Sequence, residues 1–523
     1  MLLDSWKSPG QLRIAVASWF RLAEAGDQFV SYPWSVHLLW AYVRRVGVAT
    51  VLSKIRSRLL ERRRNEKLAA VGTGIVLEPA DGSALRPGDA VVFFAYNHPP
   101  QPTRLCIEPA FVMPAPAGSL TLIQDAPEPM TMPAALQRYV GWSPYGGIEL
   151  DTVAVAEGLR DLVAQLSTEP APEGTIDIEQ QRSQVREFTP NPDRPRAGQP
   201  TAVLFGLGNY AKTQIIPNIR KHLDLVRIHE VDPHQLASFG RSTTLGLDTS
   251  PLPRDDTPYD AWFIAGYHHT HADLAIAALA QGACAVIEKP IATTVDQYAR
   301  LRRAIDNAEN PRYFACFHKR YSLLHDWAMR DLPGPDAPVD MHCIVYEIPV
   351  PRLHWYNWPN SGTRMVSNGC HWLDYFLYVN RYATPTDLTI APLRGHDLRL
   401  HVRLDNGAHL TMALTDAGSC RTGVREHVEL RSADVMIRMT DASDYHAEKG
   451  YRVRRRGRTN PKSAYARMYR RIAHAISQGL PGDSADTLLS SELTLQLDRM
   501  LREQRRQQTP SAAAAAPSLA TPA

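Results

Sequence analysis

The sequence has little of what marks secreted, zinc-binding or membrane-spanning proteins. Only 6 of its 523 residues are cysteine, and no two of them form a C-x-x-C pair, which argues against a disulfide framework and a zinc knuckle. No apolar run approaches the ~20 residues that a membrane-spanning helix needs. The first residues lack the pattern of a secretory signal. We therefore expect a cytoplasmic protein with reduced thiols, no resident metal and no membrane span.

A strong excess of charge of one sign is also missing. The 58 basic residues nearly balance the 54 acidic ones, and the net charge of +4 is too small to recruit nucleic acid. Hydrophobic residues make up 44% of the chain, which is enough for packed cores, and its length predicts two or three domains. We expect a globular protein without a nucleic-acid partner.

Two stretches have the composition of connecting segments. Residues 169–199 hold several prolines among charged and amide residues, which is typical of a linker. Residues 508–523 contain an alanine run and are expected to form a disordered tail. Between them, short apolar runs alternate with helical patterns, which indicates βαβ units.

A glycine-rich turn directly follows a buried-strand pattern. Ala202–Phe205 is a continuous apolar run, typical of a strand buried on both faces of a parallel sheet. Gly206, Gly208 and Ala211 then supply a tight turn, an open backbone for a pyrophosphate and a small residue for helix packing. A second apolar run, Leu225–Val231, is expected to form the next strand and ends at Asp232, 24 residues after Gly208. This is near the position of a carboxylate that holds ribose hydroxyls.

Asp232 decides the expected cofactor. Its carboxylate would repel a 2′-phosphate, so the sequence favours NAD over NADP. The alternatives are an ordinary strand-to-helix turn at the glycines and a helix-capping role for Asp232 before Pro233.

A Glu-Lys-Pro sequence follows another apolar run. Glu288, Lys289 and Pro290 come at the end of a predicted parallel strand, where open α/β sheets bind their ligands. We expect Lys289 to be partly desolvated and oriented by Glu288, so that the lysine takes a proton from a substrate hydroxyl. A surface salt bridge at a strand end is the alternative. Thr293 is expected to begin a helix, with Asp296 three residues further on.

Three histidines lie on one turn before a predicted helix. They are His268, His269 and His271, with no Cys, Asp or Glu at metal-ligand intervals. This spacing favours a helix start or a cofactor contact over zinc.

The order of these motifs resembles the glucose–fructose oxidoreductase, inositol dehydrogenase and MocA family over about residues 198–505. After Glu-Lys-Pro come Phe317–Tyr321 and then Gly369-x-His371-x-x-Asp374, and this combination is more specific than any one motif. His371 and Asp374 are also three residues apart, which places them on one helix face.

The resemblance implies an α/β protein with two main domains. A Rossmann domain over 200–325 would be followed by an α+β domain over 326–507, with an open, largely antiparallel sheet and C-terminal helices. It also implies hydride transfer to C4 of NAD, with Lys289 and His371 as the acid–base pair and Asp374 beside the histidine.

Cofactor and substrate residues follow from the same resemblance. The expected cofactor contacts are Gly206, Gly208, Asn209, Tyr210, Ala211, Asp232, His271, Glu288, Lys289 and Pro290. The residues expected to face the substrate are Arg320, Trp355, Trp358, Arg364, Ser367 and Asn368. Aromatic faces and arginine suit a sugar or a phosphorylated sugar, and core packing is the alternative for the tryptophans. Ser367 stands where the family commonly has an acidic residue, and a serine cannot hold a proton as a carboxylate does.

Residues 1–168 carry a separate pattern of helical and β character. A densely basic helical stretch over 44–67 is interpreted as a solvated face. Short β patterns follow at 74–78, 90–96 and 104–108, with a Pro-Gly-Asp turn at 87–89. Residues 50–116 resemble the GroES-like domain of medium-chain alcohol dehydrogenases without that family's zinc ligands, which implies a module with no zinc chemistry.

The predicted function is NAD-dependent oxidation of a secondary hydroxyl on a sugar, cyclitol or nucleotide-linked sugar, by a homo-oligomer. One alternative is an NAD-dependent glycoside hydrolase of the same fold. Another is a catalytically silent NAD-binding scaffold, motivated by Ser367.

Overall fold

The computed structural model describes residues 12–21, 68–80, 83–98, 104–107, 112–114, 198–230, 245–248, 253, 258–349, 356, 361–418 and 423–508. Contacts group the chain into two compact units. Residues 1–322, 350–362 and 460–484 make the first unit, and residues 323–349, 363–459 and 485–523 make the second. The predicted basic helix, the C-terminal tail, Asp232, Trp355 and Trp358 lie outside the described residues.

The N-terminal part of the first unit contains a five-stranded antiparallel sheet in the order β4-β1-β2-β3-β5. Its strands are β1 (Leu12–Arg21), β2 (Leu68–Glu78), β3 (Ala90–His98), β4 (Arg104–Ile107) and β5 (Val112–Pro114). Gly88 turns the chain between β2 and β3 with a φ of 95°, and its N–H donates to Val76 O at 2.8 Å. The β patterns expected at 74–78, 90–96 and 104–108 match β2, β3 and β4, whereas β1 was not predicted. The GroES-like assignment stays a prediction.

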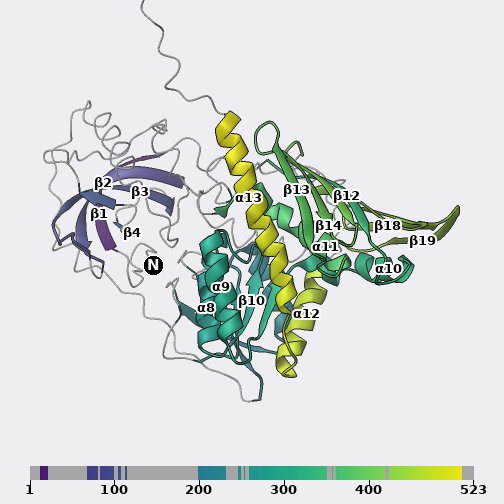
Figure 1. Ribbon diagram of the computed structural model, residues 1–523. Helices are drawn as coiled ribbons and strands as arrows, with labels where there is room; N and C mark the ends of the chain where they lie inside the picture. Colours follow the sequence, from purple (N-terminus) through teal and green to yellow (C-terminus); the bar gives the residue numbers. More distant parts are fainter. Residues whose placement is uncertain are drawn as a thin grey trace, which may run out of the picture. The chain divides into compact units, whose positions relative to one another are not determined.

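The predicted Rossmann domain is confirmed by a six-stranded, fully parallel sheet in the order β11-β10-β9-β6-β7-β8. Its strands are β6 (Thr201–Phe205), β7 (Asp224–His229), β8 (Gly246–Asp248), β9 (Ala261–Ile264), β10 (Cys284–Glu288) and β11 (Tyr313–Cys316). Almost every strand residue is buried, as apolar runs covered on both faces require. Helices α8 (His271–Ala280) and α9 (Val295–Asn307) lie side by side beside the sheet (Figure 1).

Helix α12 (Ser463–Ser477) packs on this same parallel sheet. Its apolar stripe, Met468, Ile472 and Ile476, recurs at helical spacing and joins the core formed by β6, β7 and β9. Residues 460–484 therefore group with the first unit, whereas the sequence prediction placed the whole of 326–507 in the second domain.

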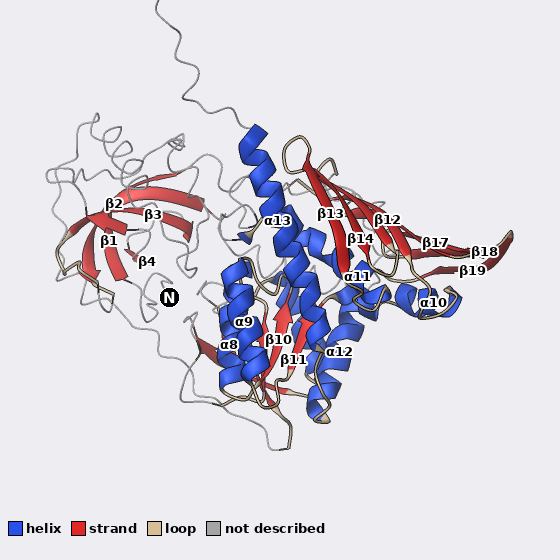
Figure 2. Cartoon of the chain, in the orientation of Figure 1, coloured by secondary structure: helices blue, strands red, loops and turns tan. Residues whose placement is uncertain are grey.

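The second unit is built on an eight-stranded sheet in the order β13-β14-β15-β12-β16-β17-β18-β19. All of its strand pairs are antiparallel except β12 with β15, which confirms the predicted open, largely antiparallel sheet (Figure 2). The strands are β12 (Asp340–Tyr346), β13 (Pro385–Pro392), β14 (Leu398–Leu404), β15 (His409–Thr415), β16 (Arg425–Ser432), β17 (Val435–Thr440), β18 (Asp444–Lys449) and β19 (Arg452–Arg458).

The described part of the second unit contains three α-helices. They are α10 (Leu323–Asp331), α11 (Cys370–Val379) and α13 (Leu489–Gln508). Buried side chains alternate along the central strands, and the inward ones form one core with residues of α11 and α13, among them Phe376 and Leu497. Among the described helices, none has the length and apolarity to cross a membrane.

Candidate dinucleotide site

The glycine turn after β6 has the shape that a dinucleotide requires. Gly206 has a φ of 95°, and a Cβ there would lie 2.6 Å from Ala265 O, so only glycine fits. Gly208 has nothing within 4 Å of where a Cβ would be, which leaves its backbone open to a ligand. Ala211 is buried at the start of the π-helical segment η3 (Ala211–Ile215). The turn therefore leaves room for a ligand, and its contact with a pyrophosphate stays a prediction.

Glu230 is a candidate that sequence reasoning missed. It directly follows β7, and its Oε2 accepts a hydrogen bond from the N–H of Leu207 at 2.6 Å. A carboxylate beside the glycine turn, at the end of the next parallel strand, stands where Rossmann domains bind the ribose. Its separation of 22 residues from Gly208 is also closer to the usual ~20 than that of Asp232.

His271 anchors the Glu-Lys-Pro segment to the end of β9. Its Nδ1 lies 2.8 Å from Pro290 O, and its Nε2 lies 3.2 Å from Gly266 O. Burial lowers the pKa of this histidine, and its hydrogen bonds to backbone carbonyls act in the opposite direction. The sequence prediction made His271 a cofactor contact. In the structure the described ring contacts are with two backbone carbonyls and with the His268 ring, whose centre lies 5.9 Å away.

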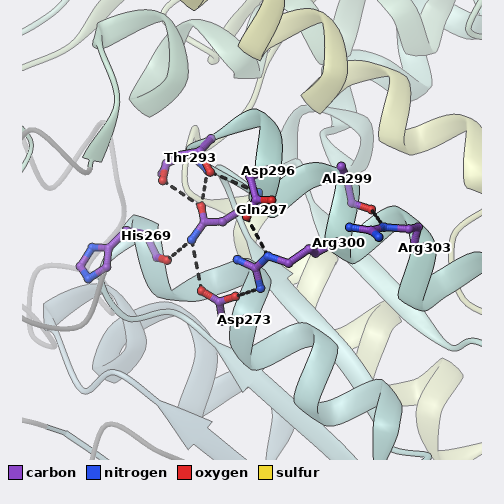
Figure 3. A network of polar contacts seen from close by, with 9 residues as sticks. His269, Asp273, Thr293, Asp296, Gln297, Ala299, Arg300 and Arg303 are labelled. Atoms are coloured by element: carbon purple, nitrogen blue, oxygen red, sulfur yellow. Dashed lines mark hydrogen bonds and ion pairs between the residues drawn. The ribbon is translucent and has the colours of Figure 1, made fainter. Parts of the chain in front are cut away.

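A polar network fixes the histidine turn to the start of α9 (Figure 3). The Gln297 amide donates to His269 O at 2.6 Å and accepts from the N–H and hydroxyl of Thr293 at 3.1 and 3.0 Å. The helix N-cap is Thr294, whose hydroxyl accepts from Gln297 N at 3.2 Å. The helix was predicted to begin at Thr293, one residue before the N-cap in the structure. Asp296, predicted to support that start, forms an ion pair with Arg300, one turn along α9.

Lys289 is half-buried at the carboxyl end of β10, as partial desolvation requires. Its ammonium lies 5.8 Å from the centre of the Tyr356 ring, and the His268 ring lies 5.1 Å from the same ring. Burial, and then the charge of Lys289, hold the pKa of His268 well below its usual value. The lysine therefore has a neutral imidazole and an aromatic ring as neighbours.

Glu288 is the buried centre of a phenol network next to this lysine. Its Oε1 accepts from Tyr210 OH at 2.8 Å and, in a short contact, from Tyr469 OH. Its Oε2 lies 3.3 Å from the donating N–H of Lys289. Burial raises the pKa of Glu288, while the two phenols and the lysine lower it. Tyr210 was predicted near the cofactor, whereas Tyr469 of α12 was not predicted at all.

Arg320 is held inside the first unit. Its guanidinium is buried, lies 3.8 Å from the Asp483 carboxylate and sits 5.1 Å from the centre of the Phe317 ring. Arg320 was predicted to face the substrate, and its described contacts are with these two residues of the first unit.

Two predicted substrate residues in the second unit bind one buried carboxylate. Glu347, directly after β12, lies 3.4 Å from the Arg364 guanidinium and accepts a short hydrogen bond from the Asn368 amide. Arg364 also donates to Ile348 O at 3.1 Å. Glu347 was not predicted, and a charged residue at the end of a strand was the signal that could have found it.

The Gly-x-His-x-x-Asp motif spans the junction of η8 (Met365–Gly369) and α11. Asp374 is fully buried, and its Oδ1 accepts from the Ser490 hydroxyl at 2.7 Å. His371 and Ser367 are buried as well. The structure therefore holds Asp374 from the start of α13, a partner that spacing along one helix could not indicate.

Comparison with known proteins agrees with this geometry. Residues 201–314 match the model of an oxidoreductase family with an NAD-binding Rossmann fold, GFO_IDH_MocA. The Rossmann domain of this chain is similar to that family over these residues. The match confirms the predicted oxidoreductase family and its cofactor, NAD, which the glycine turn fits.

Solved structures share the fold at low sequence identity. A dehydrogenase from Chromobacterium violaceum has 13% identity and a TM-score of 0.50, covering 60% of this chain and 98% of that one. An oxidoreductase from Agrobacterium radiobacter, solved with NAD+, L-tartaric acid and magnesium, has 15% identity, the same coverage and a TM-score of 0.50. No curated protein matches the chain. Within the described residues, no cluster of three or more His, Cys, Asp or Glu side chains could hold a metal ion.

Proposed function

We propose that this protein is an NAD-dependent dehydrogenase that oxidises a secondary hydroxyl of a sugar, cyclitol or nucleotide-linked sugar. The observation that carries the proposal is the placement of Lys289, half-buried at the carboxyl edge of a parallel sheet. The domain that contains this sheet matches the model of an NAD-binding oxidoreductase family. As part of the same proposal, the protein works in the cytoplasm as a homo-oligomer on a small-molecule substrate.

In this proposal, some residues of the first unit bind the cofactor and another transfers the proton. The open backbone at Gly208 would hold the pyrophosphate, and Glu230 would accept hydrogen bonds from the ribose hydroxyls. NAD, when bound, supplies the hydride acceptor. Lys289 takes the hydroxyl proton at Nζ, which requires the free amine, and its partial burial favours that neutral form.

The second unit contributes His371 to the proposal. The Gly-x-His-x-x-Asp motif, in which this histidine precedes Asp374, supports a role for His371 as the second acid–base group. Arg364 and Asn368 both contact the Glu347 carboxylate, so we assign them a structural role in the second unit.

The first test is a thermal-shift screen of NAD(H), NADP(H) and nucleotide sugars, followed by turnover assays on the sugars that bind. In the Lys289→Ala variant we expect kcat/KM to fall by about 10²–10⁴-fold while NADH still binds. Unchanged turnover in Lys289→Ala would remove the lysine from the reaction. Release of sugar without a steady rise in NADH absorbance would favour glycoside hydrolysis instead.

A pair of variants tests the ribose contact. Glu230→Ala is expected to weaken NADH binding about 10-fold or more, because a hydrogen bond to a charged group contributes about 1.5–3 kcal/mol. Asp232→Ala is the matched control, and titration calorimetry measures both. If only Asp232→Ala weakens binding, the ribose carboxylate is Asp232.

A further inference from the structure

Tyr469 reaches the Glu-Lys-Pro segment from a helix that comes 181 residues later in the chain. Its helix, α12, is firmly seated on the parallel sheet, since Tyr469 itself is fully buried in the core. The Arg470 guanidinium adds a hydrogen bond of 3.0 Å to Asn218. The phenol is therefore held in place independently of its contact with Glu288.

Three donors surround the Glu288 carboxylate. Tyr210 and Tyr469 donate to the same oxygen, their own hydroxyl oxygens lie 3.3 Å apart, and the Lys289 N–H faces the other oxygen. A carboxylate bound at both oxygens cannot rotate freely, so Glu288 keeps one orientation beside the lysine.

The phenols also act on the charge of Glu288. Hydrogen bonds donated to a carboxylate favour its ionised form, whereas burial favours the protonated form. Burial and the nearby Glu288 raise the pKa of both Tyr210 and Tyr469, so both phenols stay protonated and act as donors. Loss of one phenol would shift Glu288 toward its protonated form and remove a negative charge next to Lys289.

We propose that Tyr469 is a positioning residue for Lys289: together with Tyr210 it holds Glu288 in its charged form and in one orientation beside the lysine. The inference rests on the proposed function in taking Lys289 as the proton acceptor. It also links the lysine to the glycine turn, because Tyr210 stands two residues after Gly208.

The test measures the titration of the Lys289 amine directly. The full chain, without cofactor or substrate, is labelled competitively with trace acetic anhydride across a pH series, and the Lys289 peptide is quantified by mass spectrometry. We expect Tyr469→Phe and Glu288→Gln each to move the labelling midpoint to lower pH by ~0.5–1 unit, since a nearby negative charge favours the ammonium form. Tyr313→Phe is the matched control, because it removes a buried phenol that donates to Ser484 O at 2.7 Å and not to Glu288.

Each outcome decides the proposal. A midpoint that moves in Glu288→Gln but not in Tyr469→Phe would overturn the role of Tyr469. An equal shift in Tyr313→Phe would also overturn it, because the shift would then come from a general loosening of the core. If Tyr469→Phe does not fold, Tyr210→Phe removes the other donor from the same oxygen and carries the same expectation. The labelling needs no substrate, so a failure to find dehydrogenase activity would contradict the proposed function and leave this result standing.

Kinetics give a second readout once a substrate is known. The acid limb of the kcat/KM profile should move to lower pH in Tyr469→Phe, in the same direction as the labelling midpoint. An acid limb that stays in place while the midpoint moves would overturn the link to catalysis.

Discussion

Two buried glutamates at strand ends, one in each unit, have opposite kinds of neighbour. Glu288 closes β10 and accepts hydrogen bonds from two neutral phenols. Glu347 follows β12 and faces the Arg364 guanidinium, a group that does not lose its proton in proteins. The two phenols that donate to the first carboxylate neutralise no charge, whereas the second carboxylate faces a permanent cation. The comparison teaches that buried carboxylates at similar strand positions can be stabilised by different kinds of neighbour, neutral phenols in one unit and a cation in the other.

The largest expected effect comes from breaking the ion pair of the second unit. Glu347→Ala leaves the buried Arg364 guanidinium without its carboxylate, which should lower the free energy of unfolding by about 3–5 kcal/mol. The Glu347→Met/Arg364→Met double variant should recover most of that loss, since no charge is left uncompensated. Denaturant titration followed by circular dichroism measures both. A loss below about 1 kcal/mol in the single variant would show that the pair is not structural.

A smaller effect is expected from the amide that shares this carboxylate. Asn368→Ala removes a hydrogen bond to a charged group and should cost about 1.5–3 kcal/mol in unfolding free energy. The same denaturant titration applies, with Asn406→Asp as a control in the same unit, because it removes an amide that donates to the neutral Asn380 Oδ1 and keeps the oxygen that accepts from Ala408 N–H. Equal losses in the two variants would mean that the charge of Glu347 adds nothing to this contact.

The smallest effect is a pH dependence at Glu288. Because burial raises its folded-state pKa above the unfolded value, this residue's contribution to stability is complete below about pH 4.3 and is lost as pH rises through the folded-state pKa. The Glu288→Gln variant lacks that loss, so its unfolding free energy relative to the native protein should improve between pH 4.3 and 7. The improvement is limited to about 1.4 kcal/mol per pH unit. A flat difference across this range would contradict the assigned shift.

Local patterns were enough to predict much of the first unit. The apolar run Ala202–Phe205 became β6, Gly206 took the positive φ that its turn requires, and Lys289 lies at the end of a parallel strand. Each of these features depends on residues within a few positions of one another. Family resemblance added the open antiparallel sheet of the second unit.

Other features depend on partners that no local pattern encodes. Tyr469 meets Glu288 across 181 residues, and Ser490 meets Asp374 across 116, so only the packing of whole helices brings them together. Glu230 was missed for a different reason, since the apolar run Leu225–Val231 was interpreted as strand to its last residue. In the structure β7 ends at His229, two residues earlier, and the carboxylate at that end belongs to Glu230.

The return of α12 to the parallel sheet has a consequence for synthesis. At about 5–20 residues per second, Tyr469 leaves the ribosome roughly 10–40 s after Glu288, which precedes it by 181 residues. During that interval the nascent sheet lacks the side chains of Met468, Ile472 and Ile476. The parallel sheet of the Rossmann domain therefore receives α12 only after all eight described strands of the second unit have been translated.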